Sequence, residues 1–214
     1  MIKIQRFVFN YFYENTYLVW DDFSKDAIII DPGMNERNEE VTLNNFVFEN
    51  SLNLKFLLNT HCHIDHILGN NFIKENYDVE FFAPEEDLFL LKSLEQQASL
   101  FNIKFKNSPL PDKYLTEEIG LQIGNSKIKF LFTPGHTPGE FCIYLPNEKI
   151  LFSGDVLFRE SIGRTDLWKA NHNQLINSIK DKLLKLDDDV IVYPGHDMHT
   201  TIGYEKLNNH YLNF

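Results

Sequence analysis

The chain has 214 residues, of which 43% are hydrophobic and 14% aromatic, which is enough to build a substantial core and too much for a disordered chain. Its formal net charge of −11 argues against nucleic acid or an anionic membrane as the main partner, because both need a basic face. Two cysteines cannot form a disulfide framework, and neither an apolar leader nor a run of ~20 apolar residues is present. We therefore expect a single cytoplasmic domain over residues 1–214, with its oligomeric state left open.

Strand and helix patterns alternate along the chain. Apolar and polar residues alternate from Ile2 to Phe9, and further predicted strands are 16–20, 27–30, 54–58, 79–83, 127–132, 141–145, 149–152 and 189–193. Predicted helices are 39–52, 67–76, a long helix opened by Pro84 and its following acids, a helix capped by Asn171 that runs to about Lys185, and a short helix from Thr201. This mixture predicts an α/β protein with helices covering its sheets.

Several of the predicted strands end in clusters of Gly, Pro, His and Asp. These clusters occupy residues 30–33, 59–61, 133–136, 153–155 and 193–196. Loops at strand ends are where a rigid scaffold presents its functional side chains. We therefore expect the chemistry of this protein to come from these loops.

One cluster is the strongest sign of metal binding. His61, His63, Asp65 and His66 fall within six residues, directly after the apolar strand 54–58. Packing a core does not call for such a cluster, and leaving it unsatisfied would be costly. Two residues apart on extended backbone, His61 and His63 face the same side and can chelate one ion, whereas Cys62 between them points away. The cluster therefore predicts a metal site.

Three more strand-end residues complete a set of seven donors. Alone, His136, Asp155 and His196 would each be ordinary turn residues, but beside the cluster they are candidate ligands. Five imidazoles and two carboxylates suit two divalent ions that share one carboxylate. We expect zinc, with iron and manganese as alternatives that accept the same donors. Spacing alone does not assign His136 or His196 to a particular ion.

The motifs resemble those of the metallo-β-lactamase superfamily. Residues 60–66 resemble its HxHxDH signature, and the later loops follow in the family's order: 133–139 resembles the third-histidine loop, 153–155 the bridging-aspartate motif and 193–196 the last histidine. The stretches 158–167 and 200–205 are similar to the short branch of glyoxalase II-like, or hydroxyacylglutathione hydrolase-like, enzymes. The resemblance implies a four-layer αββα sandwich of two mixed β-sheets flanked by helices.

The same resemblance implies a division of the ligands. One ion would be held by His61, His63 and His136, and the other by Asp65, His66 and His196, with Asp155 bridging the two. Asp31, in the turn that closes the strand 27–30, is a candidate to brace a ligand imidazole, with a plain strand-terminating turn as the alternative.

The implied activity is the hydrolysis of a small acyl thioester, as in glyoxalase II. Two neighbouring ions lower the pKa of a shared water, so a bridging hydroxide can attack the carbonyl near neutral pH while the second ion stabilises the oxyanion. Asp65 and Asp155 are the expected catalytic carboxylates, Asp65 orienting the hydroxide. A thiolate, with a pKa of about 8.5, can leave without an acid.

The sequence indicates substrate contacts less clearly than it indicates metal ligands. Arg164, in the Gly-Arg-Thr-Asp segment 163–166, is the candidate contact for a substrate carboxylate, and a salt bridge with Asp166 is its alternative. For Arg159 we expect a salt bridge with Glu160. The segment lacks the Lys and Tyr that enzymes acting on glutathione thioesters carry, so the carrier thiol is left open.

Two other functions compete with the hydrolase. The same motifs also resemble those of persulfide dioxygenases. These enzymes use one iron held by two histidines and one aspartate, which here would be His61, His136 and Asp155. The segments 161–163 and 201–203 favour the hydrolase over that mononuclear enzyme. A degenerate binding module is the third possibility, and the presence of all seven donors argues against it.

Overall fold

The computed structural model describes residues 1–212. The chain divides into two compact units, the first comprising Met1–Tyr114 with Gln122–Ser126 and the second Leu115–Leu121 with the chain from Lys127 onward. The single domain expected over residues 1–214 stays a prediction, and its last two residues lie outside the described range. No helix within residues 1–212 is long and apolar enough to cross a membrane.

The first unit is built on a six-stranded mixed sheet with the order β1-β2-β3-β4-β5-β6. Its strands are β1 (Ile2–Phe9), β2 (Glu14–Asp21), β3 (Asp26–Ile30), β4 (Asn53–Leu58), β5 (Glu80–Ala83) and β6 (Lys113–Tyr114). The first three strands pair antiparallel, and β3 to β6 run parallel. Every residue of β2 is buried, as expected for a strand covered on both faces.

Parallel pairing brings the ends of β3, β4 and β5 to one edge of this sheet. The amide of Asp31, just after β3, donates to the carbonyl of Leu58 (2.9 Å), and that of Asn59, just after β4, donates to the carbonyl of Phe82 (3.0 Å). Because the strands end in step, the loop holding Asp31 and the loop holding His61 begin side by side.

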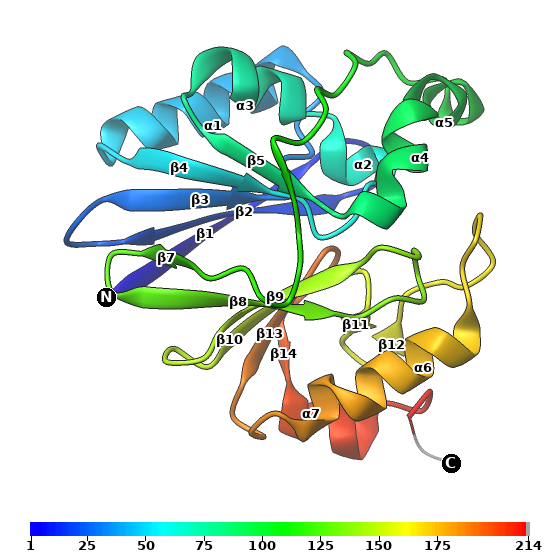
Figure 1. Cartoon of the computed structure of the whole chain (residues 1–214). Helices are drawn as coiled ribbons and strands as arrows, with labels where there is room; N and C mark the ends of the chain where they lie inside the picture. The colour runs from blue at the N-terminus through cyan, green and yellow to red at the C-terminus, as the bar shows by residue number, and fades with distance from the viewer. Residues whose placement is uncertain (213–214) are drawn as a thin grey trace. The chain divides into compact units, whose positions relative to one another are not determined.

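Helices cover the sheet of the first unit. They are α1 (Arg37–Glu49), α2 (Ile64–Ile67), α3 (Asn70–Asn76), α4 (Leu88–Lys92) and α5 (Leu94–Phe101), with a 3₁₀ turn at Glu85–Asp87. In Figure 1, α1 and α3 lie along the same face of the sheet. Leu43 of α1, Ile73 of α3 and Leu94 of α5 join Leu18 and Ile29 of the strands in one buried core.

The second sheet also has six strands, in the order β14-β13-β10-β9-β8-β7. They are β7 (Leu121–Ile123), β8 (Ser126–Phe132), β9 (Phe141–Leu145), β10 (Ile150–Gly154), β13 (Ile191–Pro194) and β14 (Thr200–Thr201), beside a two-stranded ribbon of β11 (Leu157–Phe158) and β12 (Ser161–Ile162). Strand β10 pairs parallel with β13 and antiparallel with β9, which in turn is antiparallel to β8. Strands β8, β10 and β13 therefore point the same way, and all three end at one edge.

Two helices and a 3₁₀ turn pack with this sheet. They are α6 (His172–Asp181), α7 (Ile202–Asn208) and the turn Leu183–Lys185. The side chain of Asn171 accepts the amide of Gln174, which confirms the predicted cap of α6. Figure 1 shows α6 and α7 on the same side of the sheet, and Leu175 and Ile179 of α6 pack with Leu151 and Val192 in its core.

The α/β class with two mixed sheets flanked by helices is confirmed, whereas some helix bounds were wrong. The single long helix expected after Pro84 is broken at Ser93, whose hydroxyl donates to the carbonyl of Phe89 (2.7 Å) and competes with the helical amide. The helix expected over 67–76 is split at Gly69, where the backbone packs too closely on Met34 to leave room for a Cβ. The helix from Asn171 ends at Asp181 rather than Lys185.

Candidate metal centre

In the first unit, the loop after β4 carries four of the predicted ligands. His61 and His66 are fully buried, whereas His63 and Asp65 are partly exposed. The rings of His61 and His66 have centroids 4.1 Å apart, and those of His61 and His63 are 4.9 Å apart. Cys62 lies in the hydrophobic core, so its thiol is directed away from the imidazoles, as expected. The four donors predicted from this loop therefore gather on one side of it.

Asp31 organises this loop through both of its carboxylate oxygens. Oδ1 accepts the amide of Thr60 (2.7 Å), and Oδ2 accepts the hydroxyl of Thr60 (2.6 Å) and Nδ1 of His66 (3.2 Å). The backbone of Asp31 is left-handed (φ 48°), a conformation that aspartate tolerates better than most residues. The brace predicted for Asp31 is thus present, and the ring it orients is that of His66.

The hydrogen bonds fix the tautomers of His61 and His66. The single proton of the Thr60 hydroxyl goes to Asp31, so Nδ1 of His61, 3.1 Å from that hydroxyl, must be the donor. A carboxylate can only accept, so Nδ1 of His66 also carries its proton. Both rings therefore hold their lone pair on Nε2, the atom that is then available to a metal.

In the second unit, the remaining three ligands lie on the loops after β8, β10 and β13. Nε2 of His136 is 3.5 Å and Nε2 of His196 is 3.7 Å from Oδ2 of Asp155. The amide of Gly195 donates to the carbonyl of Gly154 (2.8 Å), which ties the last two of these loops together. Asp155 is thus the carboxylate around which both predicted histidine ligands of this unit gather.

His136 is oriented by main chain rather than by a side chain. Its Nδ1 lies 2.8 Å from the carbonyl oxygen of Arg164, so Nδ1 is protonated and Nε2 again holds the lone pair. The approach requires Gly163, because a Cβ there would collide with the carbonyl of Asp155 and press on the side chain of His136. The segment expected to contact substrate thus has a second role in supporting two ligands.

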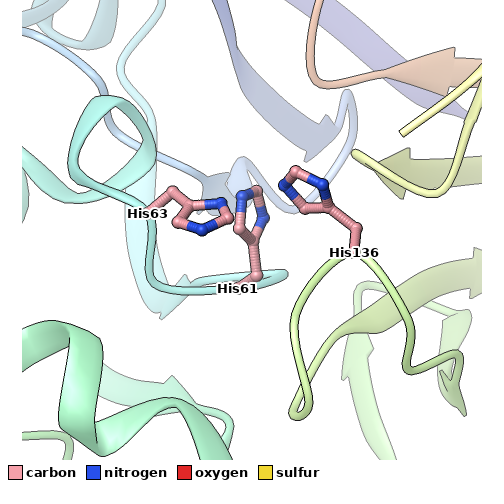
Figure 2. A group of neighbouring side chains, drawn as sticks. All are labelled: His61, His63 and His136. Carbon is pink, nitrogen blue, oxygen red and sulfur yellow. The ribbon is translucent and has the colours of Figure 1, made fainter. Parts of the chain in front are cut away.

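The spacing of these donors suits metal coordination better than direct hydrogen bonding. Nε2 of His66 is 3.5 Å from Oδ2 of Asp65, much like the two spacings around Asp155. Two ligands at about 2.1 Å from a tetrahedral ion lie about 3.4 Å apart. Nitrogen and carboxylate oxygen donors at this separation fit a divalent ion within each unit's ligand set. Figure 2 shows His61 and His63 on the loop after β4 and His136 on the loop after β8.

The side chain of Arg164 forms an exposed ion pair. Its Nε and Nη2 donate to the two carboxylate oxygens of Asp166 (2.8 and 2.9 Å). The guanidinium holds the pKa of Asp166 at about 2, below its usual range. Arg159 stacks over the ring of Tyr204 (4.8 Å), and the hydroxyl of Tyr204 donates to Glu160, so one tyrosine contacts both Arg159 and Glu160.

Four fully buried carboxylates were not predicted from the sequence: Glu14, Asp87, Glu140 and Glu205. Oδ2 of Asp87 accepts the amide of Cys62 (3.2 Å), which supports the loop between His61 and His63. Glu205 accepts the Thr200 hydroxyl (2.5 Å) and the amide of Glu160 (2.9 Å). Glu14 and Glu140 each stand as a single acid at the start of an apolar strand, a pattern from which their burial could have been predicted.

The surroundings of Glu14 favour its protonated form. The Thr16 hydroxyl lies 2.8 Å from Oε2 of Glu14 and 2.9 Å from the carbonyl of Asp31, and it accepts the amide of Gly33 (2.9 Å). Its one proton is available to two acceptors, so this hydroxyl compensates a charged Glu14 carboxylate only in part. Burial raises the pKa of Glu14 well above its ordinary value, which favours this neutral form.

Comparisons with known proteins agree with the motifs and the fold. The sequence model of the metallo-beta-lactamase superfamily matches residues 10–196. The chain is 42% identical over 204 residues to the hydroxyacylglutathione hydrolase GloC of Haemophilus influenzae, covering 94% of each protein.

Solved structures give the same result. The BLEG-1 B3 metallo-beta-lactamase has a TM-score of 0.90 at 33% identity, over 100% of both chains. The di-iron-bound form of TTHA1623 has a TM-score of 0.87 at 32% identity, over 97% of this chain and 100% of the other. ETHE1 of Myxococcus xanthus has a TM-score of 0.77 at 26% identity, over 97% of this chain and 83% of the other.

The Asp31 network yields the first prediction. In Asp31→Asn, an amide NH₂ replaces Oδ2 and faces two other donors, so His66 loses the acceptor that fixes its ring. We expect metal affinity to fall by about 10- to 100-fold. Competition with a chelating dye measures this, with Asp22→Asn, an exposed partner of Lys25, as the control. Unchanged affinity in Asp31→Asn would contradict the bracing role.

Glu14 yields a prediction about pH. A carboxyl whose pKa rises on folding stabilises the folded state only below its unfolded pKa, near 4.5, and that stability is lost as the pH rises toward the folded pKa. Glu14→Gln mimics the protonated acid and removes the loss. We expect the variant to gain stability over wild type by about 1.4 kcal/mol per pH unit within this window. Urea unfolding from about pH 5 to about pH 8 tests this, and a pH-independent difference would refute it.

Proposed function

Since this chain belongs to the metallo-β-lactamase superfamily, we propose that it is a metal-dependent hydrolase that cleaves a small acyl thioester in a glyoxalase II-like reaction. The observation that carries the proposal is the orientation of the ligands. His61, His66 and His136 each have Nδ1 engaged by a partner within its own unit, which directs Nε2 to a metal. Such preset tautomers are the mark of metal-ligating imidazoles.

We propose that seven residues supply the ligands of two divalent ions: His61, His63, Asp65, His66, His136, Asp155 and His196. The superfamily motif order supports this set, and so does the spacing of donors within each unit. Zinc is the metal we propose, although the di-iron form of TTHA1623 shows that iron is accepted by a related protein. When bound, the pair of ions supplies a hydroxide nucleophile near neutral pH and polarises the acyl carbonyl.

The protein's own groups do the rest of the proposed chemistry. Asp155 would be a ligand common to both sets, and Asp65 would orient the attacking oxygen by accepting a hydrogen bond from it. The Asp31–Thr60 network keeps His61 and His66 from rotating, so the ligands need little reorganisation during the reaction. A thiolate leaving group needs no general acid, in agreement with a site made of metal ligands.

The proposed substrate is a small thioester that carries a carboxylate, with Arg164 as its contact. The Arg164 guanidinium is exposed and already bound to Asp166, so a substrate carboxylate would displace Asp166 in the same two-pronged geometry. The compartment we propose is the cytoplasm, consistent with two cysteines that are both free and buried.

A mononuclear-iron persulfide dioxygenase is the second candidate, and the similarity to ETHE1 favours it in part. Its three expected ligands are His61, His136 and Asp155. In that arrangement His66 is not a ligand, so it does not explain why Nδ1 of His66 is bound by Asp31 while Nε2 lies 3.5 Å from Asp65. We therefore prefer the hydrolase, which uses both of those residues.

The main test combines metal analysis with two assays. Freshly purified protein is expected to hold about two ions per chain and to cleave a small acyl thioester without consuming oxygen. Asp155→Ala should lower kcat/KM by about a hundredfold or more, whereas Asp181→Asn, a surface carboxylate of the same unit, should not. One iron per chain with oxygen uptake on a persulfide would overturn the hydrolase, and full activity of Asp155→Ala would exclude both functions.

Arg164 is tested by a pair of substitutions with opposite effects. Arg164→Ala removes the substrate contact and should raise KM about tenfold with little change in kcat. Asp166→Ala removes the competing carboxylate and should lower KM. Both variants keep the main-chain carbonyl that holds His136, so the metal content serves as an internal control. An unchanged KM in both variants would mean that Arg164 does not contact the substrate and that the Arg164–Asp166 ion pair is only structural.

A further inference from the structure

Glu140 is a fully buried carboxylate of the second unit that belongs to none of the proposed ligand sets. It stands immediately before β9, at the end of the loop that begins at Thr133 and carries His136. Burying a carboxylate is costly unless charges or hydrogen bonds compensate it, so its presence in this position needs a physical reason.

The backbone and the side chain of Glu140 hold two different ligand loops. Its carbonyl oxygen accepts the amide of Thr133 (2.8 Å), which closes the loop around His136 at its base. Its Oε1 accepts the amide of Asp155 (2.7 Å) in the loop after β10. Glu140 therefore links the loop that carries His136 to the backbone of Asp155, whose carboxylate lies beside the ring of His136.

The peptides flanking Asp155 are held at both ends. Its N–H is bound by Glu140, and its carbonyl is packed against Gly163, where no Cβ would fit. The preceding residue, Gly154, is left-handed (φ 50°), so the chain turns sharply at this point. Without the Glu140 side chain, the buried amide of Asp155 would lose this acceptor at the point where the chain turns.

We infer that Glu140 is a positioning residue that sets the placement of Asp155 between His136 and His196. This role of Glu140 rests on the proposed function. Glu140 acts through Asp155 and would touch neither metal nor substrate. The side-chain oxygen of Glu140 accepts a short hydrogen bond (2.7 Å) from the amide of Asp155, which fixes the start of the Asp155 side chain. The result is a carboxylate oxygen 3.5 Å from Nε2 of His136 and 3.7 Å from Nε2 of His196.

The test compares Glu140→Gln with Glu140→Ala. Glutamine keeps an oxygen of the same shape at the Asp155 amide, whereas alanine removes it. We expect Glu140→Ala to lose about 10- to 100-fold in zinc affinity, measured by chelator competition without substrate, and Glu140→Gln to lose less than about threefold. Glu118, an exposed acid of the same unit, supplies the matched controls Glu118→Ala and Glu118→Gln.

Cobalt substitution adds a readout that general destabilisation would not produce. The visible absorption of bound Co²⁺ reports ligand geometry, so it should change in Glu140→Ala and be restored in Glu140→Gln. Circular dichroism checks that each variant is folded, and a Glu140→Ala protein that fails to fold is replaced by Glu140→Ser, which also lacks the long side chain.

The outcomes separate this inference from the proposed function. If wild-type protein binds two ions and the short-side-chain variant binds them equally well, with the same cobalt spectrum, Glu140 has no positioning role. If Glu140→Gln loses as much affinity as the short variant, the negative charge matters rather than the hydrogen bond, and the inference is again wrong. If wild-type protein binds no divalent ion, the metal-dependent hydrolase itself fails.

Discussion

The proposed chemistry depends on the hydrogen-bond acceptors that hold three of the four proposed ligand loops. Asp31 holds Thr60, Asp87 holds Cys62 and Glu140 holds Asp155, while the carbonyl of Arg164 holds the ring of His136. Loops rich in Gly and Pro have little intrinsic order, so these contacts replace the regularity that strands and helices supply. The proposed ligands are thereby restricted to few conformations, which lowers the entropy lost on binding.

These supports have an electrostatic cost as well as a geometric benefit. Carboxylates of Asp31, Asp65 and Asp87 lie within the first unit, and those of Glu140 and Asp155 within the second. So much negative charge at low solvent exposure repels itself, and divalent cations are the natural compensation. Glu14 illustrates a different way of limiting this repulsion, since burial raises the pKa of its carboxyl and so favours the neutral form. A protein of this design is expected to be more stable with its metals than without them.

The sequence indicated a full set of candidate ligands, whereas it indicated few of the residues that support their loops. The cluster from His61 to His66 was informative because a core has no other use for it, and strand-end loops were recognisable from Gly and Pro. Hydrogen bonds between distant segments, such as Glu140 to Asp155, leave no local pattern, so the four buried acids were missed. The helix break at Ser93 was missed for a related reason, since a hydroxyl that bonds to its own helix looks the same in sequence as one exposed to solvent.

The support of His136 by the main chain at Arg164 bears on how this family of sites can change over time. A carbonyl oxygen is common to every amino acid, so replacing the side chain at position 164 leaves the ring of His136 held as before. Gly163, by contrast, tolerates no side chain. Substitution can therefore alter the proposed substrate contact at position 164 while position 163 must remain glycine, so selectivity can diverge without disturbing the support of His136.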